Sequence, residues 1–224
     1  MGQRYVLPEQ VDAEREFLPT KVWWRFAAKF NVAPSEYLPA IRWQDGQSEA
    51  SMLRWGFIPA SAEGRLLESP TASTAIYQLL EKPSYREAWL NSQRCIVPLA
   101  GYYGWALTAA KHRQPYFFSL IHRAVFGVAG IWDRTVKDED DVLETCSVLR
   151  VSANQMTSQT TGERRMPAIL RRKDYQTWLR GTPAEAIALL HPYKSEWMHA
   201  HPVSPRVNSL AQDDAALTYP AAVL

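Results

Sequence analysis

Cysteine is scarce in this chain of 224 residues, which has only Cys95 and Cys146. Two cysteines cannot build the disulfide framework of a small secreted protein. No apolar run approaches the ~18 residues that a membrane span requires, so no membrane contact is expected. The N-terminal residues also lack the apolar stretch of a signal peptide, which predicts a cytoplasmic protein.

Sequence motifs for several kinds of chemistry are absent as well. There is no glycine-rich phosphate loop and no G-x-S-x-G elbow around a nucleophilic serine. His199 and His201 have no cysteine nearby, which is a poor pattern for metal ligands. We therefore expect neither a metal nor a cofactor. Each cysteine lies within an apolar run and is expected to be a small core residue.

The composition is that of a folded protein, with 46% hydrophobic, 12% aromatic and 21% charged residues. This apolar content is enough to form a core, and it argues against disorder. The length fits one large domain or two small ones. The net charge of +2 neither requires nor excludes a nucleic-acid partner.

Charge is unevenly distributed along the chain. Residues 137–144 carry five acidic side chains against one lysine, which is typical of a solvated loop. Residues 161–180 carry six basic side chains against two acidic ones, and they bracket the apolar stretch Met166 to Leu170. These arginines either solvate the ends of a strand or present a cationic rim to phosphates, and the pattern alone leaves both open.

Tryptophan is abundant, with nine residues. Five of them are candidates for stacking on nucleic-acid bases: Trp23, Trp24, Trp43, Trp55 and Trp105. Packing in a β-rich core is the more common use of such residues.

The local patterns predict strands in the middle of the chain and helices around them. Strands are expected at 94–99, 115–121, 125–132 and 143–151, the second and third of these forming a hairpin. Helices are expected at 85–91 after a capping box of Ser84 and Glu87, at 173–180 before Gly181, and at 184–190 after a capping box of Thr182 and Glu185. This arrangement favours an α+β fold, a single domain on a mixed, barrel-like β-sheet with flanking helices.

Seven short sequence words, in order, carry a resemblance to a known family. They are FNVAPS (30–35), RWGFIP (54–59), EKPSYREAW (81–89), RCIVPLAGYYGW (94–105), VAGIW (128–132), SANQMTSQTTGERRMPAIL (152–170) and HPVSPRVNS (201–209). Together they resemble the SOS-response-associated peptidase (SRAP) family of abasic-site-processing proteins. The match implies a SRAP-like domain over residues 1–210, followed by a C-terminal tail at 211–224.

The resemblance implies binding of single-stranded DNA and capture of abasic sites in the DNA-damage response. Family members begin Met-Cys-Gly-Arg, and the amine and thiol of their cysteine close a thiazolidine ring on the sugar aldehyde. By the same match, Arg4, Asn31, Asn154 and Arg165 fall on positions that face the DNA backbone or order the site. We expect Arg4 and Arg165 to lie on one wall of the same groove.

This chain departs from the family where the covalent chemistry takes place. Gly2 stands at the position of the cysteine, Gly104 at that of a glutamate and Glu163 at that of a histidine. Ser61 replaces a tryptophan, and no Asn-Ala-Arg-x-Glu-Thr word precedes Glu81. Several groups that act as a unit are missing together, so little of their rate should remain.

Two functions are therefore considered for the chain. The first is binding of single-stranded or abasic DNA without a stable thiazolidine cross-link. At most, weak imine chemistry would remain, through the Gly2 amine with Glu163 as acid or base. The second is a catalytically inactive SRAP fold reused to bind a protein or a small ligand.

Overall fold

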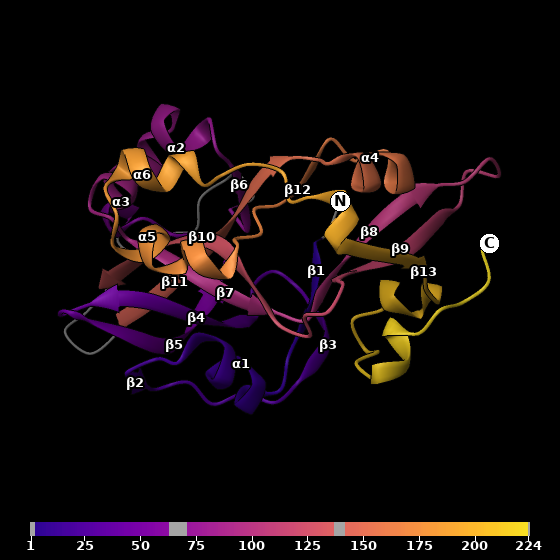
Figure 1. The fold of residues 1–224 in the computed structure, drawn as a ribbon, viewed down its shortest axis with the longest axis horizontal. Coiled ribbons are helices and arrows are strands. Elements are labelled where there is room, and N and C mark those ends of the chain that lie inside the picture. The colour runs from indigo at the N-terminus through magenta and orange to yellow at the C-terminus, as the bar shows by residue number, and fades with distance from the viewer. Residues whose placement is uncertain (1–2, 63–70, 137–141, 224) are drawn as a thin grey trace.

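A closed ring of strands forms the larger part of the computed structural model, which describes residues 3–62, 71–136 and 142–223 (Figure 1). The ring consists of β4 (Tyr37–Gln44), β5 (Gln47–Trp55), β7 (Arg94–Leu99), β10 (Phe126–Val136) and β11 (Val142–Ser152). Four neighbouring pairs are antiparallel, and the parallel pairing of β11 with β5 closes the ring. The expected mixed, barrel-like sheet is confirmed.

Local sequence explains how one part of this ring forms. Asp45 and Gly46, both with positive φ, join β4 and β5 as a two-residue turn. Such a turn matches the twist of an antiparallel hairpin, and glycine adopts it without steric cost. Cys95 and Cys146 are fully buried in the main core, as the apolar runs around them predicted.

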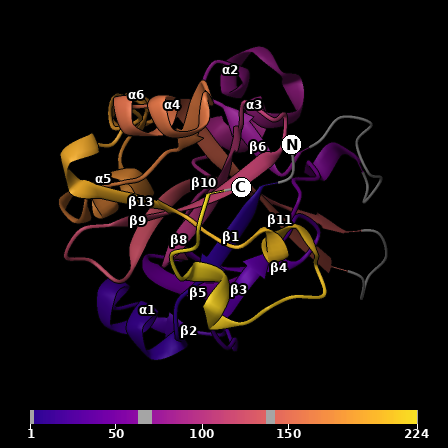
Figure 2. The same cartoon turned by 90° about the vertical axis from the view of Figure 1, so that its right-hand side faces the viewer.

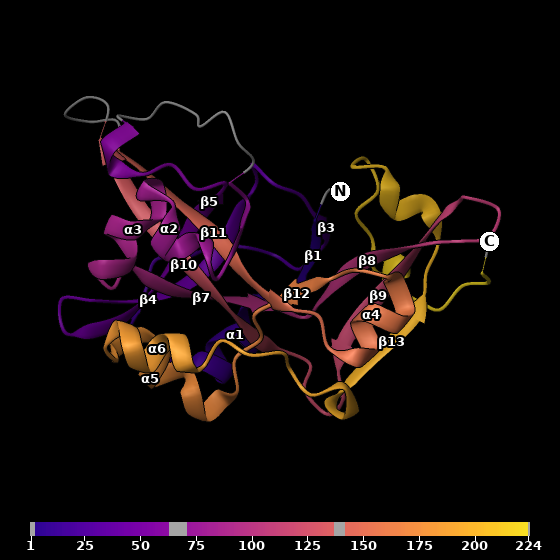
Figure 3. The same ribbon diagram turned by 90° about the horizontal axis from the view of Figure 1, so that it is seen from above.

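A second, antiparallel sheet lies beside the ring and has the strand order β13-β9-β8-β1-β3. Its strands are β1 (Arg4–Leu7), β3 (Lys29–Val32), β8 (Gly101–Leu107), β9 (Arg113–Leu120) and β13 (Met198–Pro202). Three short strands extend the ring: β2 (Lys21–Val22), β6 (Ser73–Ala75) and β12 (Arg165–Pro167). Figure 3 shows β12 between the ring and the second sheet, next to β8.

Helices flank both sheets: α1 (Gln10–Phe17), α2 (Gln78–Glu81), α3 (Pro83–Leu90), α4 (Gln155–Thr161), α5 (Tyr175–Arg180) and α6 (Pro183–Ala188). The buried Arg94 ties α5 to the ring, because its Nε donates to the carbonyl of Trp178 at 2.6 Å. Its guanidinium also lies 5.6 Å from the ring centroid of Trp89. No helix of the described residues is long and apolar enough to cross a membrane.

Two local expectations are wrong. The strands at 115–121 and 125–132 do not form a hairpin, because β9 pairs with β8 and β13 whereas β10 pairs with β7 and β11. The link between them carries the chain from one sheet to the other. The capping box of Ser84 and Glu87 is also absent, since α3 begins at Pro83 and its N-cap is Lys82. The capping box of Thr182 and Glu185 is confirmed.

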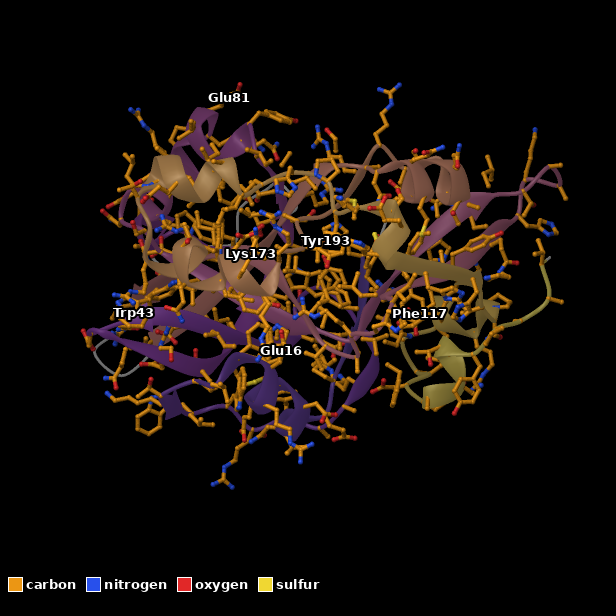
Figure 4. All side chains as sticks on the ribbon, viewed as in Figure 1. Glu16, Trp43, Glu81, Phe117, Lys173 and Tyr193 are labelled. Atoms are coloured by element: carbon orange, nitrogen blue, oxygen red, sulfur yellow. The ribbon has the colours of Figure 1, made fainter. Side chains whose placement is uncertain are left out.

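The C-terminal segment packs against the second sheet, where it lies across β3 (Figure 2). The carboxylate of Asp213 accepts hydrogen bonds from the backbone amides of Phe30 and Asn31, at 2.6 and 3.1 Å. Leu217 is fully buried in a small cluster that includes Phe117, which is labelled in Figure 4. The residues after 210 thus cover one edge of this sheet.

Candidate functional site

A pocket of about 220 Å³ opens between the second sheet and the end of β11. Residues of β1, β8 and β9 line one side, and residues of α4, β11 and β12 line the other. Gln3, the first described residue of the chain, also lines it. The pocket therefore lies at the N-terminus, where the sequence resemblance expects the site.

Buried aromatic side chains form the floor of this pocket. The ring of Tyr102 stacks on Phe118, with centroids 4.9 Å apart, and the ring of Tyr5 stacks on Trp55 at 4.4 Å. Burial raises the pKa of both phenols well above their usual value. The Tyr102 hydroxyl lies 3.4 Å from Oγ1 of Thr157 on α4. These phenols stay neutral at physiological pH and present a rigid, mainly apolar surface.

Three charged side chains line the pocket above this floor: Arg150, Glu163 and Arg165. Arg165 lies over the ring of Tyr77, with its guanidinium carbon 5.0 Å from the centroid, a cation–π contact that fixes its direction. Glu163 follows Gly162, whose φ of 71° ends α4 in the left-handed conformation. Its backbone N–H donates to Thr161 Oγ1 at 3.3 Å. With two arginines and one carboxylate, the pocket is cationic.

Gly104 lies in the wall of the pocket, where its neighbours leave little room for a side chain. A Cβ at this position would lie 3.1 Å from the ring of Phe118 and 3.1 Å from the methyl group of Thr161. Both distances are tighter than normal van der Waals contact. A glutamate side chain could enter here only if these neighbours moved by a few tenths of an ångström.

The structure brings only some of the predicted site residues together. Glu163 and Arg165 line the pocket, whereas Gly2 lies outside the described residues. Arg4 is not among the lining residues. Side chains alternate along a strand, so Gln3 and Tyr5 face the pocket while Arg4 faces the other side of β1.

On that other side, Arg4 is held within the chain. Its Nη1 donates to the carbonyl of Gln3 at 3.0 Å, and its Nε is buried without a hydrogen-bond partner among the described residues. Burial lowers the pKa of Arg4, and the nearby Glu36 opposes this shift. Arg4 is thus outside the lining of this pocket, and its expected role beside Arg165 in binding DNA stays a prediction.

Asn31 and Asn154 are buried and hold other segments in place. The Asn31 amide lies within 2.9 to 3.2 Å of the carbonyl oxygens of Val207, Ser209 and Gln212. Asn154 caps α4 by accepting from the N–H of Thr157 at 2.9 Å, and it donates to the carbonyl of Tyr193. Asn154 thus caps the helix that lines the pocket, and the expected roles of both asparagines in binding DNA stay predictions.

The tryptophans have different roles. Trp24 and Trp55 are buried, Trp43 packs against the core beneath Arg180, and Trp23 is 68% exposed. Trp105 lines the pocket, and its Nε1 donates to Oδ1 of Asn208 at 2.9 Å. The pocket wall therefore contains one candidate stacking residue, Trp105, which Asn208 holds in place.

Sequence reasoning missed Arg150. It lies on β11, next to the apolar residues Val148, Leu149 and Val151, and its side chain reaches the pocket. The available signal was a single charged residue among apolar neighbours in a strand. Such a charge must reach water or a partner, which indicates an opening beside the strand.

Comparison with known proteins identifies the fold and the family. The family model described as "SOS response associated peptidase (SRAP)" matches residues 1–210. The chain belongs to the SRAP family. It is 30% identical over 197 residues to the Bacillus subtilis protein named "Abasic site processing protein YobE", and the alignment covers 87% of each chain. It is 26% identical to the Rattus norvegicus "Abasic site processing protein HMCES", covering 77% of this chain and 57% of that protein.

Solved structures agree with this assignment. A crystal structure of a protein from Bacteroides thetaiotaomicron is similar with a TM-score of 0.71 and 29% identity, covering 84% of this chain and 82% of that one. A second, from Bordetella bronchiseptica, has a TM-score of 0.76 at 22% identity, covering 91% and 100% of the two chains, and supports the fold alone. The chain thus has the SRAP fold, and Gly104 and Glu163 lie in the lining of its pocket.

Proposed function

We propose that this chain binds single-stranded DNA, including strands with an abasic site, in the response to DNA damage. The observation that carries the proposal is the pocket at the N-terminus, cationic and walled by aromatic side chains. Cations attract the phosphate backbone, and aromatic faces stack on bases or sugars without regard to sequence. The names of the SRAP relatives, abasic site processing proteins, support the same conclusion.

We further propose that binding does not lead to a stable thiazolidine. That ring needs an amine and a thiol on the same residue, and Gly2 has no side chain. Cys95 and Cys146 are fully buried, and burial raises the pKa of the Cys95 thiol to about 12. A thiol that is both inaccessible and protonated does not act as a nucleophile.

DNA binding is tested by fluorescence anisotropy with a short single strand at several salt concentrations. Affinity should fall steeply as salt rises, because phosphate contacts release counterions. Replacing Arg165 by alanine should cost about 1–3 kcal/mol, the value of a charge-assisted contact. Arg15→Ala on α1 removes an equal charge outside the pocket and serves as the control. Absence of binding at low salt, or equal losses in both variants, would contradict the proposed site.

The covalent step is tested with the same strand carrying one abasic site. After incubation and denaturing electrophoresis, the wild-type chain should give no heat-stable complex. The Gly2→Cys variant, with its methionine removed, tests whether the missing cysteine alone prevents the reaction. A heat-stable complex with this variant would show that it does. A cross-link to the wild-type protein would overturn the proposal.

A further inference from the structure

Arg150 has an unused donor inside the pocket. Its Nε is buried and has no hydrogen-bond partner, and no carboxylate of the described residues forms an ion pair with it. A buried guanidinium donor without an acceptor is costly, because the group has lost its water and gained nothing in exchange. Since Arg150 lines an open pocket and makes no hydrogen bond within the described residues, a ligand acceptor can bind the terminal N–H groups of its guanidinium.

Arg165 lies beside Arg150 on the same face. In the pairing of β11 with β12, Arg150 is opposite Pro167 and Ser152 is opposite Arg165, so the two arginines are diagonal neighbours. Diagonal neighbours across an antiparallel pair are roughly 7–8 Å apart, a span that one oxyanion can bridge when both side chains are long. Arg165 packs its guanidinium face on Tyr77, which leaves its N–H edge available.

Glu163 does not neutralise this pair. It lines the same pocket, yet it forms no ion pair with either arginine in the described part of the chain. Two guanidinium groups against one carboxylate leave an excess positive charge for a ligand to balance. A neutral sugar aldehyde offers only uncharged acceptors, which make weaker hydrogen bonds to arginine than an oxyanion does.

We infer that Arg150 and Arg165 together bind a phosphate monoester at the end of a DNA strand, an inference that rests on the proposed binding of single-stranded DNA. A monoester carries a charge of about −1.5 to −2 at neutral pH and so matches two arginines better than an internal diester does. Guanidinium groups donate paired N–H groups that fit phosphate oxygens. The buried Tyr5, Tyr102 and Phe118 close the floor, so a strand end fits this pocket better than a continuous strand.

The inference is tested by comparing three short strands of one sequence: one with a 5′-phosphate, one with a 3′-phosphate and one with hydroxyl groups at both ends. One of the phosphorylated strands should bind about 10- to 100-fold more tightly than the hydroxyl strand, as expected for hydrogen bonds to a charged group. In Arg150→Gln this ratio should fall to about one, whatever the absolute affinity. Glu163→Gln should raise the ratio, because it removes a repulsive carboxylate.

Arg164→Gln is the matched control, because Arg164 is an exposed neighbour that does not line the pocket. It removes the same charge and should keep the phosphate ratio. If the hydroxyl strand binds and neither phosphate improves binding, the inference is wrong while the proposed function stands. An equal loss of the ratio in Arg164→Gln would also overturn it, since any nearby charge would then suffice.

A measurement without DNA tests the phosphate site independently of the proposed function. Inorganic phosphate should raise the thermal unfolding midpoint of the wild-type chain above that in chloride at equal ionic strength, because a ligand of the folded state stabilises it. The increase should be lost in Arg150→Gln and kept in Arg164→Gln. No increase in the wild type, or an equal increase from acetate, would refute a phosphate site.

Discussion

Asn31 offers a direct test of whether a family position in this chain serves DNA or the fold. It is 3% exposed, and its amide is shared among the carbonyls of Val207, Ser209 and Gln212. An amide group has two donor hydrogens, so at most two of these contacts are full hydrogen bonds at once. Each contributes about 0.5–1.5 kcal/mol, so Asn31→Ala should cost about 2 kcal/mol of unfolding free energy.

For a domain of this size, each kcal/mol lowers the unfolding midpoint by about 2–4 °C, so a decrease of about 4–8 °C is expected by calorimetry. Hydrogen exchange should increase in the C-terminal segment first, because that segment loses its anchor to β3. The free energy of DNA binding should weaken by less than about 1 kcal/mol. This small effect is expected because Asn31 holds the residues beside Asn208, and Asn208 accepts a hydrogen bond from Trp105 in the pocket wall. Asn208→Ala, which removes only that contact, is the control. An unchanged midpoint together with a large loss of DNA affinity would refute this reasoning.

Three further predictions concern the pocket and the core. Gly104→Glu should destabilise the fold by about 1–3 kcal/mol, because the new side chain is overpacked against Phe118 and Thr161. Adding Thr161→Ser removes only the methyl group and should restore part of this stability, as measured by thermal unfolding. Wild-type protein treated with borohydride and abasic DNA should give no trapped imine on a denaturing gel, because several groups of the reacting set are absent together. A trapped complex that needs the free Gly2 amine would contradict that expectation. Burial raises the pKa of Cys95 and of Tyr175 to about 12, so unfolding free energy should be constant at neutral pH and should fall as the pH rises from about 9 towards 12. Unfolding monitored by circular dichroism across that range tests this prediction. A rise in the free energy of unfolding with pH would contradict it.

Local signals predicted those parts of the fold that local physics determines. The run from Arg94 to Leu99 forms a buried strand, and Thr182 with Glu185 caps a helix as expected. The closure of the ring was beyond such reasoning, because it depends on the pairing of Thr145 and Cys146 with Arg54 and Trp55. These residues are distant in sequence, and no turn or periodic pattern links them.

The same limit explains the wrong hairpin and the missed pocket residue. Proximity in sequence suggested a hairpin between β9 and β10, but each strand has better partners in a different sheet. Arg4 matched a family position, yet strand alternation directs it away from the pocket. Arg150 was missed because the sequence does not indicate which face of β11 lies beside the pocket.

Residues that are far apart in the sequence meet in the pocket. Gly104, Glu163 and Arg150 are separated along the chain and yet line the same pocket, while the residues that close the ring are ordinary core residues. The wall at Gly104 is closely packed, since a Cβ there would lie 3.1 Å from Phe118 and from Thr161, and the unpartnered Arg150 adds a cation near the floor. A pocket lined by two arginines and one carboxylate favours an anionic ligand over a neutral aldehyde, because an oxyanion between two neighbouring guanidinium groups offsets their repulsion.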